Sequence, residues 1–521
     1  MRATRVRLRQ INRIYRQRQS GNRLQDRLYL LYVAAIVTLM LGAPLSIGAV
    51  DVLRAPAAQS LLTHPDFTKF AAITSIGVLL SALWVGRFQG PITLEPFFAL
   101  LLAATDAPRS RTLWRKFAKV AAVIGVVFIV LVAIGITAHP APAGIAPAFA
   151  FAGVIGLCAG VLIAMFALVG QAGSPPSRLV TTAVLIAVAL ATGLLSPAPA
   201  LLLGTTLPGL TVRLAAVSAL VLLVVPHLLR RLSLSGLLAA GQRWHSATTA
   251  VNVGNFAQAL DLYKALPQWG RKWPAVPTNS GRALRPVAQY LRADTFAALR
   301  TPGRFWAGVA FQLVGWFLLW LGFGASAGAS TLGWISAAIG GVIIYLSSGI
   351  FTDGFRYTAQ LSRSPALYRY RSTKLLSLHG LFPLAMNLIC AAAALGIMAL
   401  SPLSNASVAV SGDTVATGNP WALAAVPIMA MPIMAVLPVV LRAFDSAKGD
   451  LPMELLAPID SPMGDMSGLI VLLWQADAVV LMLTISAGLA WLATSGFVAI
   501  LTGIAATFLV ITLLLRSRLR S

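Results

Sequence analysis

The chain has 521 residues, of which 58% are hydrophobic and only 11% are charged, and its mean hydropathy is +0.82. A soluble protein of this composition would lack the polar residues that cover a water-exposed surface, so the composition predicts a protein that lies in lipid. The net charge of +25 would indicate nucleic-acid binding in a soluble protein. In a membrane protein the same excess is expected in cytoplasmic loops, so we predict no nucleic-acid partner.

Apolar runs long enough to form spanning helices recur along the whole chain. A spanning helix needs about 20 mostly apolar residues, and in lipid its backbone groups must bond to one another. The sequence therefore predicts an all-α polytopic membrane protein with about 12 transmembrane helices. The expected spans are 28–50, 67–85, 117–138, 147–170, 179–203, 210–229, 305–323, 332–350, 375–400, 421–441, 469–492 and 497–515.

The positive charges follow these spans. If the spans alternate in direction, Arg54, Lys69 and Arg213 lie on one side, and the remainder of the 40 Lys and Arg residues lie on the other. Cytoplasmic loops hold the Lys and Arg excess of membrane proteins. We therefore expect a multi-pass protein of the plasma membrane, in contact with membrane lipids, with both termini in the cytoplasm.

The longest polar interruption divides the expected spans into six and six. The predicted organisation is a basic amphipathic arm at 1–27, a first half at 28–229, a cytoplasmic connecting region at 230–304, a second half at 305–515 and a tail at 516–521. An even number of spans in each half gives both halves the same orientation, which is a parallel repeat. The arm is either a helix on anionic headgroups or a disordered tail.

The connecting region contains one pattern of its own. Phe256, Leu260, Tyr263 and Leu266 recur at helical spacing. They predict a short amphipathic helix that packs on the inner face or on a partner, with a plain linker as the alternative.

A half-length apolar segment at 96–104 lies between the second and third spans. It is too short to cross a bilayer, and charged residues flank it on both sides. We interpret it as an elbow, a short helix or turn at the membrane surface. The segments at 353–376 and 450–469 are similar loops in the second half.

These loops resemble those of ABC-2-type exporter permeases, in which a segment of the form E-x-LL-x-x-(T/A)-P-(I/V)-(S/D)-(R/P) precedes a span. MELLAPIDSP, from Met453, is the closest match, EPFFALLLAATDAPRSR, from Glu95, is a looser one, and ALRTPGRFW, from Ala298, resembles the lead-in to a first span. The resemblance implies a fused pair of half-transporters driven by two copies of a separate cytoplasmic ATPase. ATP and Mg²⁺ would be bound by that ATPase, and this chain would bind no cofactor.

The resemblance also implies a role for the elbows, which would dock in grooves on the ATPase. The alternative is simple packing at the membrane surface that helps to set the topology. The residues expected to take part in docking are Glu95, Phe97, Phe98, Asp106, Arg109, Arg111, Asp353, Arg356, Arg363, Glu454 and Asp460.

Several catalytic signatures are missing from the sequence. It contains no Gly-Lys pair and hence no P-loop, and it has no zinc-protease, nucleophile-elbow or dinucleotide-binding motif. The five histidines are scattered outside ligand spacing, so we expect no metal site. The sequence therefore predicts a protein that is not itself an enzyme.

Asp477 is the outstanding ionisable residue inside an expected span, with Trp474 and Gln475 beside it. A carboxylate at that depth is costly, so a place on a transport path or in a proton relay is one hypothesis. A protonated side chain that hydrogen-bonds to another helix is the other. Asp477→Asn is expected to keep the fold and alter transport. Asn387 and Gln312 are weaker path candidates, for which interhelical hydrogen bonds are favoured.

Other functions fit parts of the same pattern. A secondary transporter of the major-facilitator type also has twelve spans in two parallel halves. The loop between the second and third spans lacks that family's G-x-x-x-D-R-x-G-R-(K/R) pattern, and ionisable residues within the spans are scarce. A membrane glycosyltransferase would need more acidic residues after the first span, where only Asp51 and Asp66 occur. An assembly subunit without transport activity is the remaining alternative.

Overall fold

A computed structural model of the protein describes residues 32, 38–54, 59, 65–103, 108–138, 145–194, 207–252, 256–264, 286–326, 331–362, 372–399, 434–448, 452, 455, 460–461, 464–465, 467–493, 495 and 497–520. The chain divides into two compact units. Unit 1 comprises Met1–Val251 and Gln258–Tyr263, and unit 2 comprises Asn252–Ala257 and Lys264–Ser521.

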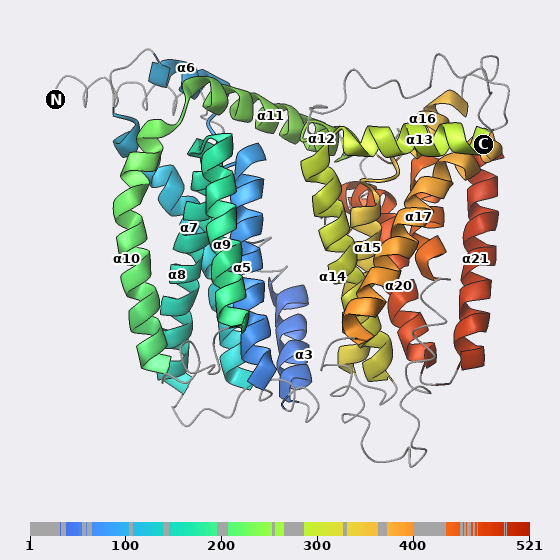
Figure 1. Ribbon diagram of the computed structural model, residues 1–521, viewed down its shortest axis with the longest axis horizontal. Helices are drawn as coiled ribbons and strands as arrows, with labels where there is room; N and C mark the ends of the chain where they lie inside the picture. The colour runs from blue at the N-terminus through green and yellow to red at the C-terminus, as the bar shows by residue number, and fades with distance from the viewer. Residues whose placement is uncertain are drawn as a thin grey trace. The chain divides into compact units, whose positions relative to one another are not determined.

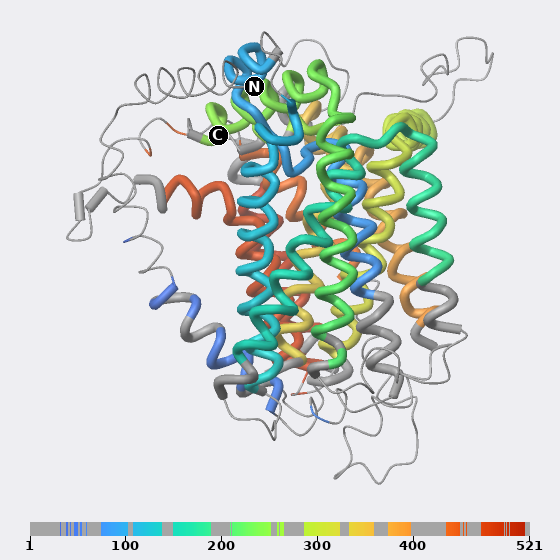
Figure 2. The backbone as a smooth tube through the Cα atoms, turned by 90° about the vertical axis from the view of Figure 1, so that its left-hand side faces the viewer, coloured from blue at the N-terminus to red at the C-terminus, as the bar shows by residue number. Residues whose placement is uncertain are grey.

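Unit 1 is built from long apolar helices that run side by side (Figures 1 and 2). A short π-helix, η1 (Thr38–Gly42), leads into α3 (Ala43–Arg54). The remaining helices are α5 (Pro65–Phe88), α6 (Pro96–Ala103), α7 (Arg109–Ala138), α8 (Ile145–Ala172), α9 (Pro175–Leu194), α10 (Leu207–Arg231) and α11 (Leu234–Asn252), followed by α12 (Phe256–Asp261).

Unit 2 has the same kinds of element. Its helices are α13 (Pro286–Leu299), α14 (Pro302–Ser326), α15 (Thr331–Ser348), α16 (Asp353–Ser362), α17 (Ser372–Ala399), a helix over 434–446, α20 (Ser467–Ala493) and α21 (Phe497–Arg520). Two short strands, β1 (Asp460–Ser461) and β2 (Gly464–Asp465), pair antiparallel before α20.

Within the described residues, six helices are long and apolar enough to cross a membrane. Their spans are Arg109–Thr137, Phe149–Ala172, Thr211–Arg231, Pro302–Phe323, Thr373–Ile397 and Ile470–Ala493. Four shorter apolar helices cover Thr74–Phe88, Pro175–Val188, Gly333–Ser348 and Leu501–Leu515. Large apolar side chains such as Val123 and Leu223 are exposed on these helices, at 66% and 76% of their surface. The protein is therefore an all-α multi-pass membrane protein.

Small residues allow the helices of each unit to approach closely. In unit 1, a β-carbon at Gly160 would meet the backbone of Ala121 and Gly125, so α8 lies directly against α7. In unit 2, a β-carbon at Gly340 would meet the backbone of Gly315 and Leu319, so α15 lies directly against α14. Such contacts replace the hydrophobic drive that is absent between helices in lipid.

The structure can be compared with three expectations from the sequence: the short helix near Phe256, the loop at 450–469 and two of the expected spans. The short helix predicted near Phe256 is present as α12, whereas α11 was not predicted. In the loop at 450–469, the described residues before α20 include the β1–β2 hairpin. The structure describes the second part of the first expected span, as η1 and the start of α3, whereas the tenth expected span lies largely outside the described residues.

Candidate functional site

We call the end of unit 1 at which α5, α8 and α10 finish and α7 and α9 begin its elbow end, because the short helix α6 lies there (Figure 1). Cationic side chains gather at this end: Arg87, Arg109, Arg111, Arg115, Lys116, Lys119, Arg178, Arg230 and Arg231. Arg54, at the opposite end of the unit, donates a hydrogen bond to the carbonyl oxygen of Thr137 (2.9 Å). Arg213, near the start of α10, also lies at that opposite end, so most but not all of the described cations of unit 1 gather at the elbow end.

Helix α6 packs one face into unit 1 and leaves the other exposed. Ala99 and Leu102 are buried in a cluster with side chains of α7, α8 and α10. Phe97 and Leu100 are 48% and 56% exposed. Because eight apolar residues cannot span a bilayer, their burial against the ends of longer helices fixes α6 at the elbow end.

The extended segment before α6 is held by hydrogen bonds to side chains. Gln171, at the end of α8, donates to the carbonyl oxygen of Ile92 (2.8 Å) and accepts from its N–H (3.3 Å). Lys116 donates to the carbonyl oxygen of Thr93 (3.2 Å). A β-carbon at Gly241 of α11 would collide with the carbonyl oxygen of Leu94, so the segment runs tightly along α11.

The other predicted docking residues of unit 1 lie around this segment. Glu95 is exposed at the start of α6, and Phe98 is half-buried with its ring centroid 5.5 Å from the Lys116 nitrogen. Arg109 donates to the carbonyl oxygen of Leu232 (2.5 Å), which joins the start of α7 to the end of α10. Arg111 is exposed.

In unit 2 the short helix α16 occupies the corresponding place between α15 and α17. Phe355 is buried against α17 and the 434–446 helix, whereas Tyr357 is 65% exposed. Arg356 is half-buried. We call the end of unit 2 where α16 lies its elbow end, and α6 and α16 the elbow helices.

Ion pairs hold the first residue of α16. The Arg304 guanidinium donates to both carboxylate oxygens of Asp353, at 2.6 and 3.2 Å, and Lys264 donates to one of them at 3.1 Å. Burial of the carboxyl raises its pKa, but the hydrogen bonds and positive charges of Arg304 and Lys264 outweigh this effect and hold the pKa of Asp353 below its ordinary value. Asp353 is therefore an ionised carboxylate at neutral pH.

Four further predicted docking residues receive no side-chain description. Asp106, Arg363 and Glu454 lie outside the described residues, and Asp460 is described only by its backbone, in β1.

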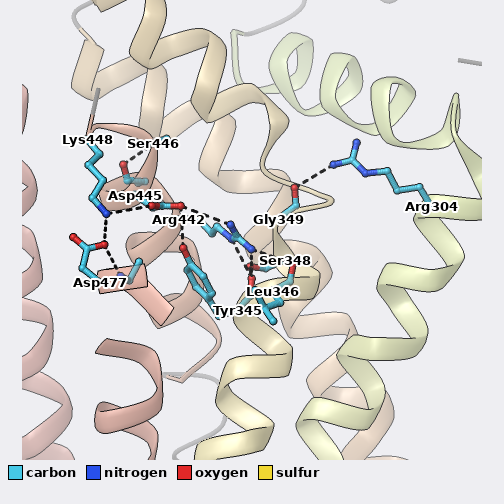
Figure 3. A network of polar contacts seen from close by, with 12 residues as sticks. Arg304, Tyr345, Leu346, Ser348, Gly349, Arg442, Asp445, Ser446, Lys448 and Asp477 are labelled. Carbon is cyan, nitrogen blue, oxygen red and sulfur yellow. Dashed lines mark hydrogen bonds and ion pairs between the residues drawn. The ribbon is translucent and has the colours of Figure 1, made fainter. Parts of the chain in front are cut away.

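A second cluster of charges lies between α15, the 434–446 helix and α20 (Figure 3). Lys448 donates to the carboxylate of Asp477 (2.5 Å), and its nitrogen lies 4.5 Å from the ring centroid of Trp474. Only 6% of the Lys448 side chain is exposed, against 25% for Asp477. The sequence favoured neither a path role nor a protonated hydrogen bond for Asp477, and the structure gives this carboxylate a cationic partner.

The same cluster extends to α15 through Asp445. Its carboxylate accepts a hydrogen bond from the Tyr345 hydroxyl (3.1 Å) and lies 3.8 Å from Arg442 and 4.0 Å from Lys448. Arg442 in turn donates to the carbonyl oxygens of Tyr345 (2.8 Å) and Leu346 (3.1 Å) in the last turn of α15. Two cations and two carboxylates therefore form a balanced network across three helices.

Sequence reasoning identified Asp477 and missed its partners. Arg442, Asp445 and Lys448 recur every three residues, which places them on nearby faces of one helix. That spacing was the available signal, although it does not indicate which helix the residues contact.

The remaining predicted path residues make contacts inside unit 2. Gln312 of α14 is fully buried, donates to the carbonyl oxygen of Ile344 (3.2 Å) and accepts from the Trp316 indole (3.1 Å). Asn387 of α17 is fully buried and donates to the carbonyl oxygen of Ala435 (3.1 Å). Gln475 is half-buried on α20. Each of the two buried amides thus joins one helix to another.

No group of three or more metal-binding side chains occurs among the residues that the structure describes. No protein-family model, curated protein or solved structure matches this chain.

Proposed function

We propose that the protein is the membrane-spanning permease subunit of an ATP-driven exporter of the ABC-2 type, with ATP hydrolysed by a separate subunit. One observation carries the proposal. Each unit has, at its elbow end, a short helix that packs one face into its own unit and exposes an aromatic residue, Phe97 in α6 and Tyr357 in α16. A motor protein could bind the exposed face of such a helix. Because the other face is rigidly packed into the bundle, force on the helix would move the bundle with it.

The charge distribution supports an orientation in which the elbow ends face the cytoplasm. In unit 1 the described cations gather at that end, and in unit 2 Arg304, Lys374, Arg442 and Lys448 do so. Loops rich in Lys and Arg remain in the cytoplasm. An ATPase that uses cytoplasmic ATP would meet the elbow helices on that side, and its acidic groups would be attracted to the surrounding cations.

The proposal includes twelve spans in two parallel halves of six. It is supported by ten apolar helices in the described residues and by the division of the chain into two compact units. In each unit a short helix follows one apolar helix and precedes the next, α5–α6–α7 and α15–α16–α17. A lipophilic, lipid or peptide substrate fits a permease whose described surface is so apolar.

The test is to purify the tagged full-length protein from its native membrane and to identify any P-loop ATPase that accompanies it. The pair is then reconstituted in lipid nanodiscs for measurement of ATP hydrolysis. Phe97→Asp together with Tyr357→Asp should weaken ATPase binding at least about tenfold, because exposed aromatic anchors dominate interface energies.

Trp244→Asp is the matched control. Trp244 is an aromatic residue of α11 that is 46% exposed at the elbow end of unit 1 but does not belong to an elbow helix. This change should leave ATPase binding unaltered. Substrate flux through the purified protein without any ATPase would overturn the proposal.

A proton-coupled secondary transporter is the second candidate, and the ion network of unit 2 favours it. Ionisable residues between spanning helices often mark proton relays, and Asp477 with Lys448 is such a pair. Flux that follows an imposed pH gradient in proteoliposomes, and that disappears in Asp477→Asn, would select this candidate.

A further inference from the structure

Two arginines lie at the elbow end of unit 1 on two helices that pack against each other. Arg87 lies in the last turn of α5, and Arg178 lies in the first turn of α9. The Nε and Nη2 atoms of Arg178 both donate to the carbonyl oxygen of Gly173, at 3.0 and 2.8 Å. This pair of hydrogen bonds holds the guanidinium against the turn between α8 and α9 and leaves its Nη1 donors for another acceptor.

The positive charge of Arg87 opposes that of Arg178, since α5 packs against α9 and the backbone of Arg87 lies against Gly170 of α8. Within the described part of unit 1, neither forms an ion pair with a carboxylate, and the Arg87 guanidinium instead lies 5.6 Å from the ring centroid of Phe88. Like charges held together without a counterion are stabilised by an anion that bridges them.

Apolar side chains surround this basic pair. Val85 of α5 is 59% exposed, and Leu179 and Val180 of α9 are 60% and 63% exposed. A free inorganic anion would gain nothing from them, whereas the acyl chains of a lipid would cover them. Because Pro175 and Pro176 have no N–H groups, the start of α9 adds few backbone donors, and the guanidinium groups must supply the recognition.

We propose that Arg87 and Arg178 bind the phosphate of an anionic phospholipid whose acyl chains lie along Val85, Leu179 and Val180. Basic sites between spanning helices are suited to such headgroups. This inference goes beyond the proposed function and does not depend on it.

The test uses the full-length protein in detergent, with lipid adducts counted by native mass spectrometry. Phosphatidylglycerol, which is anionic, should be retained, and phosphatidylcholine, which has no net charge, should be lost. The double change Arg87→Gln with Arg178→Gln should weaken phosphatidylglycerol binding about thirtyfold, since each arginine near a membrane surface contributes on the order of a factor of five.

Arg231→Gln is the matched control, because Arg231 is an exposed arginine in the last turn of α10 at the same end of the same unit. Arg231→Gln should reduce phosphatidylglycerol binding by less than about twofold. An unchanged melting temperature in lipid-free detergent would show that the double variant is folded.

Three outcomes would overturn the inference. The first is equal retention of the two lipids. The second is a double variant that, although folded, binds phosphatidylglycerol as the parent protein does. The third is displacement of the lipid by millimolar inorganic phosphate, which would assign the two arginines to a soluble anion.

Discussion

The two elbow helices are fixed by different interactions, although each occupies the same place between two apolar helices. In unit 1 the segment that leads into α6 is joined to α8 by two hydrogen bonds of the neutral Gln171 side chain. In unit 2 the first residue of α16 is joined to α14 by an ion pair between Asp353 and Arg304. The Gln171 attachment depends on uncharged groups, with Lys116 as an additional charged donor to the Thr93 carbonyl, whereas the Asp353 attachment depends on charge on both sides.

The difference has consequences for how each elbow responds to its surroundings. A neutral hydrogen bond between buried groups does not titrate and is insensitive to salt. A partly exposed ion pair weakens as ionic strength rises and disappears when its carboxylate is protonated. The Asp353 ion pair that attaches α16 should therefore depend on solution conditions that leave the Gln171 hydrogen bonds before α6 unchanged.

The largest effect is expected in the ion network of unit 2. Lys448→Met leaves the Asp477 carboxylate without its closest cation in a largely buried place, which should lower the free energy of unfolding by about 3 kcal/mol. Thermal unfolding in detergent measures the change. Lys264→Met is the control, because the Lys264 side chain is 35% exposed and Arg304 still pairs with Asp353, so its cost should be under about 1 kcal/mol.

A second change separates charge from packing at that site. Adding Asp477→Asn to Lys448→Met removes the carboxylate that has lost its lysine, and the double variant should recover about half of the lost stability. If the two changes are additive, the Lys448–Asp477 pair does not stabilise the fold.

The neutral attachment of unit 1 is tested by Gln171→Leu. Leucine has a similar volume but removes both hydrogen bonds from Ile92, a residue with 0% exposure. Leaving buried backbone groups unpaired should cost about 2 kcal/mol and accelerate amide hydrogen exchange in the segment before α6. Gln242→Leu, at an exposed position of α11, should change neither quantity.

A smaller effect is expected for Asp353→Asn in unit 2, at about 1 kcal/mol, because solvent screens this partly exposed ion pair. Amide exchange should rise in α16 and not in α6. Arg304→Gln should give the same result, and the double variant should add little to it. Equal protection of α16 in all of these variants would show that Phe355 and its apolar neighbours fix the helix alone.

The smallest effect is expected when pH is lowered, which weakens the Asp353 ion pair that attaches α16. The pKa of Asp353 is lowered in the folded protein relative to its ordinary value of 3.8, so the ion pair contributes fully above about pH 4 and is lost as pH falls through the lower folded-state pKa. Spin labels at Trp306→Cys and Tyr357→Cys should report a distance change only below about pH 4. Labels at Leu100→Cys and Arg111→Cys in unit 1 should report none.

The sequence by itself determined that the protein lies in lipid, and it indicated the apolar helices, the one-sided placement of cations and the short helix at Pro96. These features depend on hydropathy and charge within a window of neighbouring residues, so they are visible without a fold. Asp477 also stood out, because an ionised group in an apolar run is a local anomaly.

Only the tertiary structure decided which groups meet. Gln171 contacts Ile92 across 79 residues, Arg304 meets Asp353 across 49, and Lys448 meets Asp477 across 29. In the sequence, Lys448 is indistinguishable from the other cations of the loops, and Gln171 is simply a polar residue at the end of a span. Their partners are known only from the packed helices. Such pairings are fixed by how helices lie against one another, and no local pattern of residues encodes that arrangement.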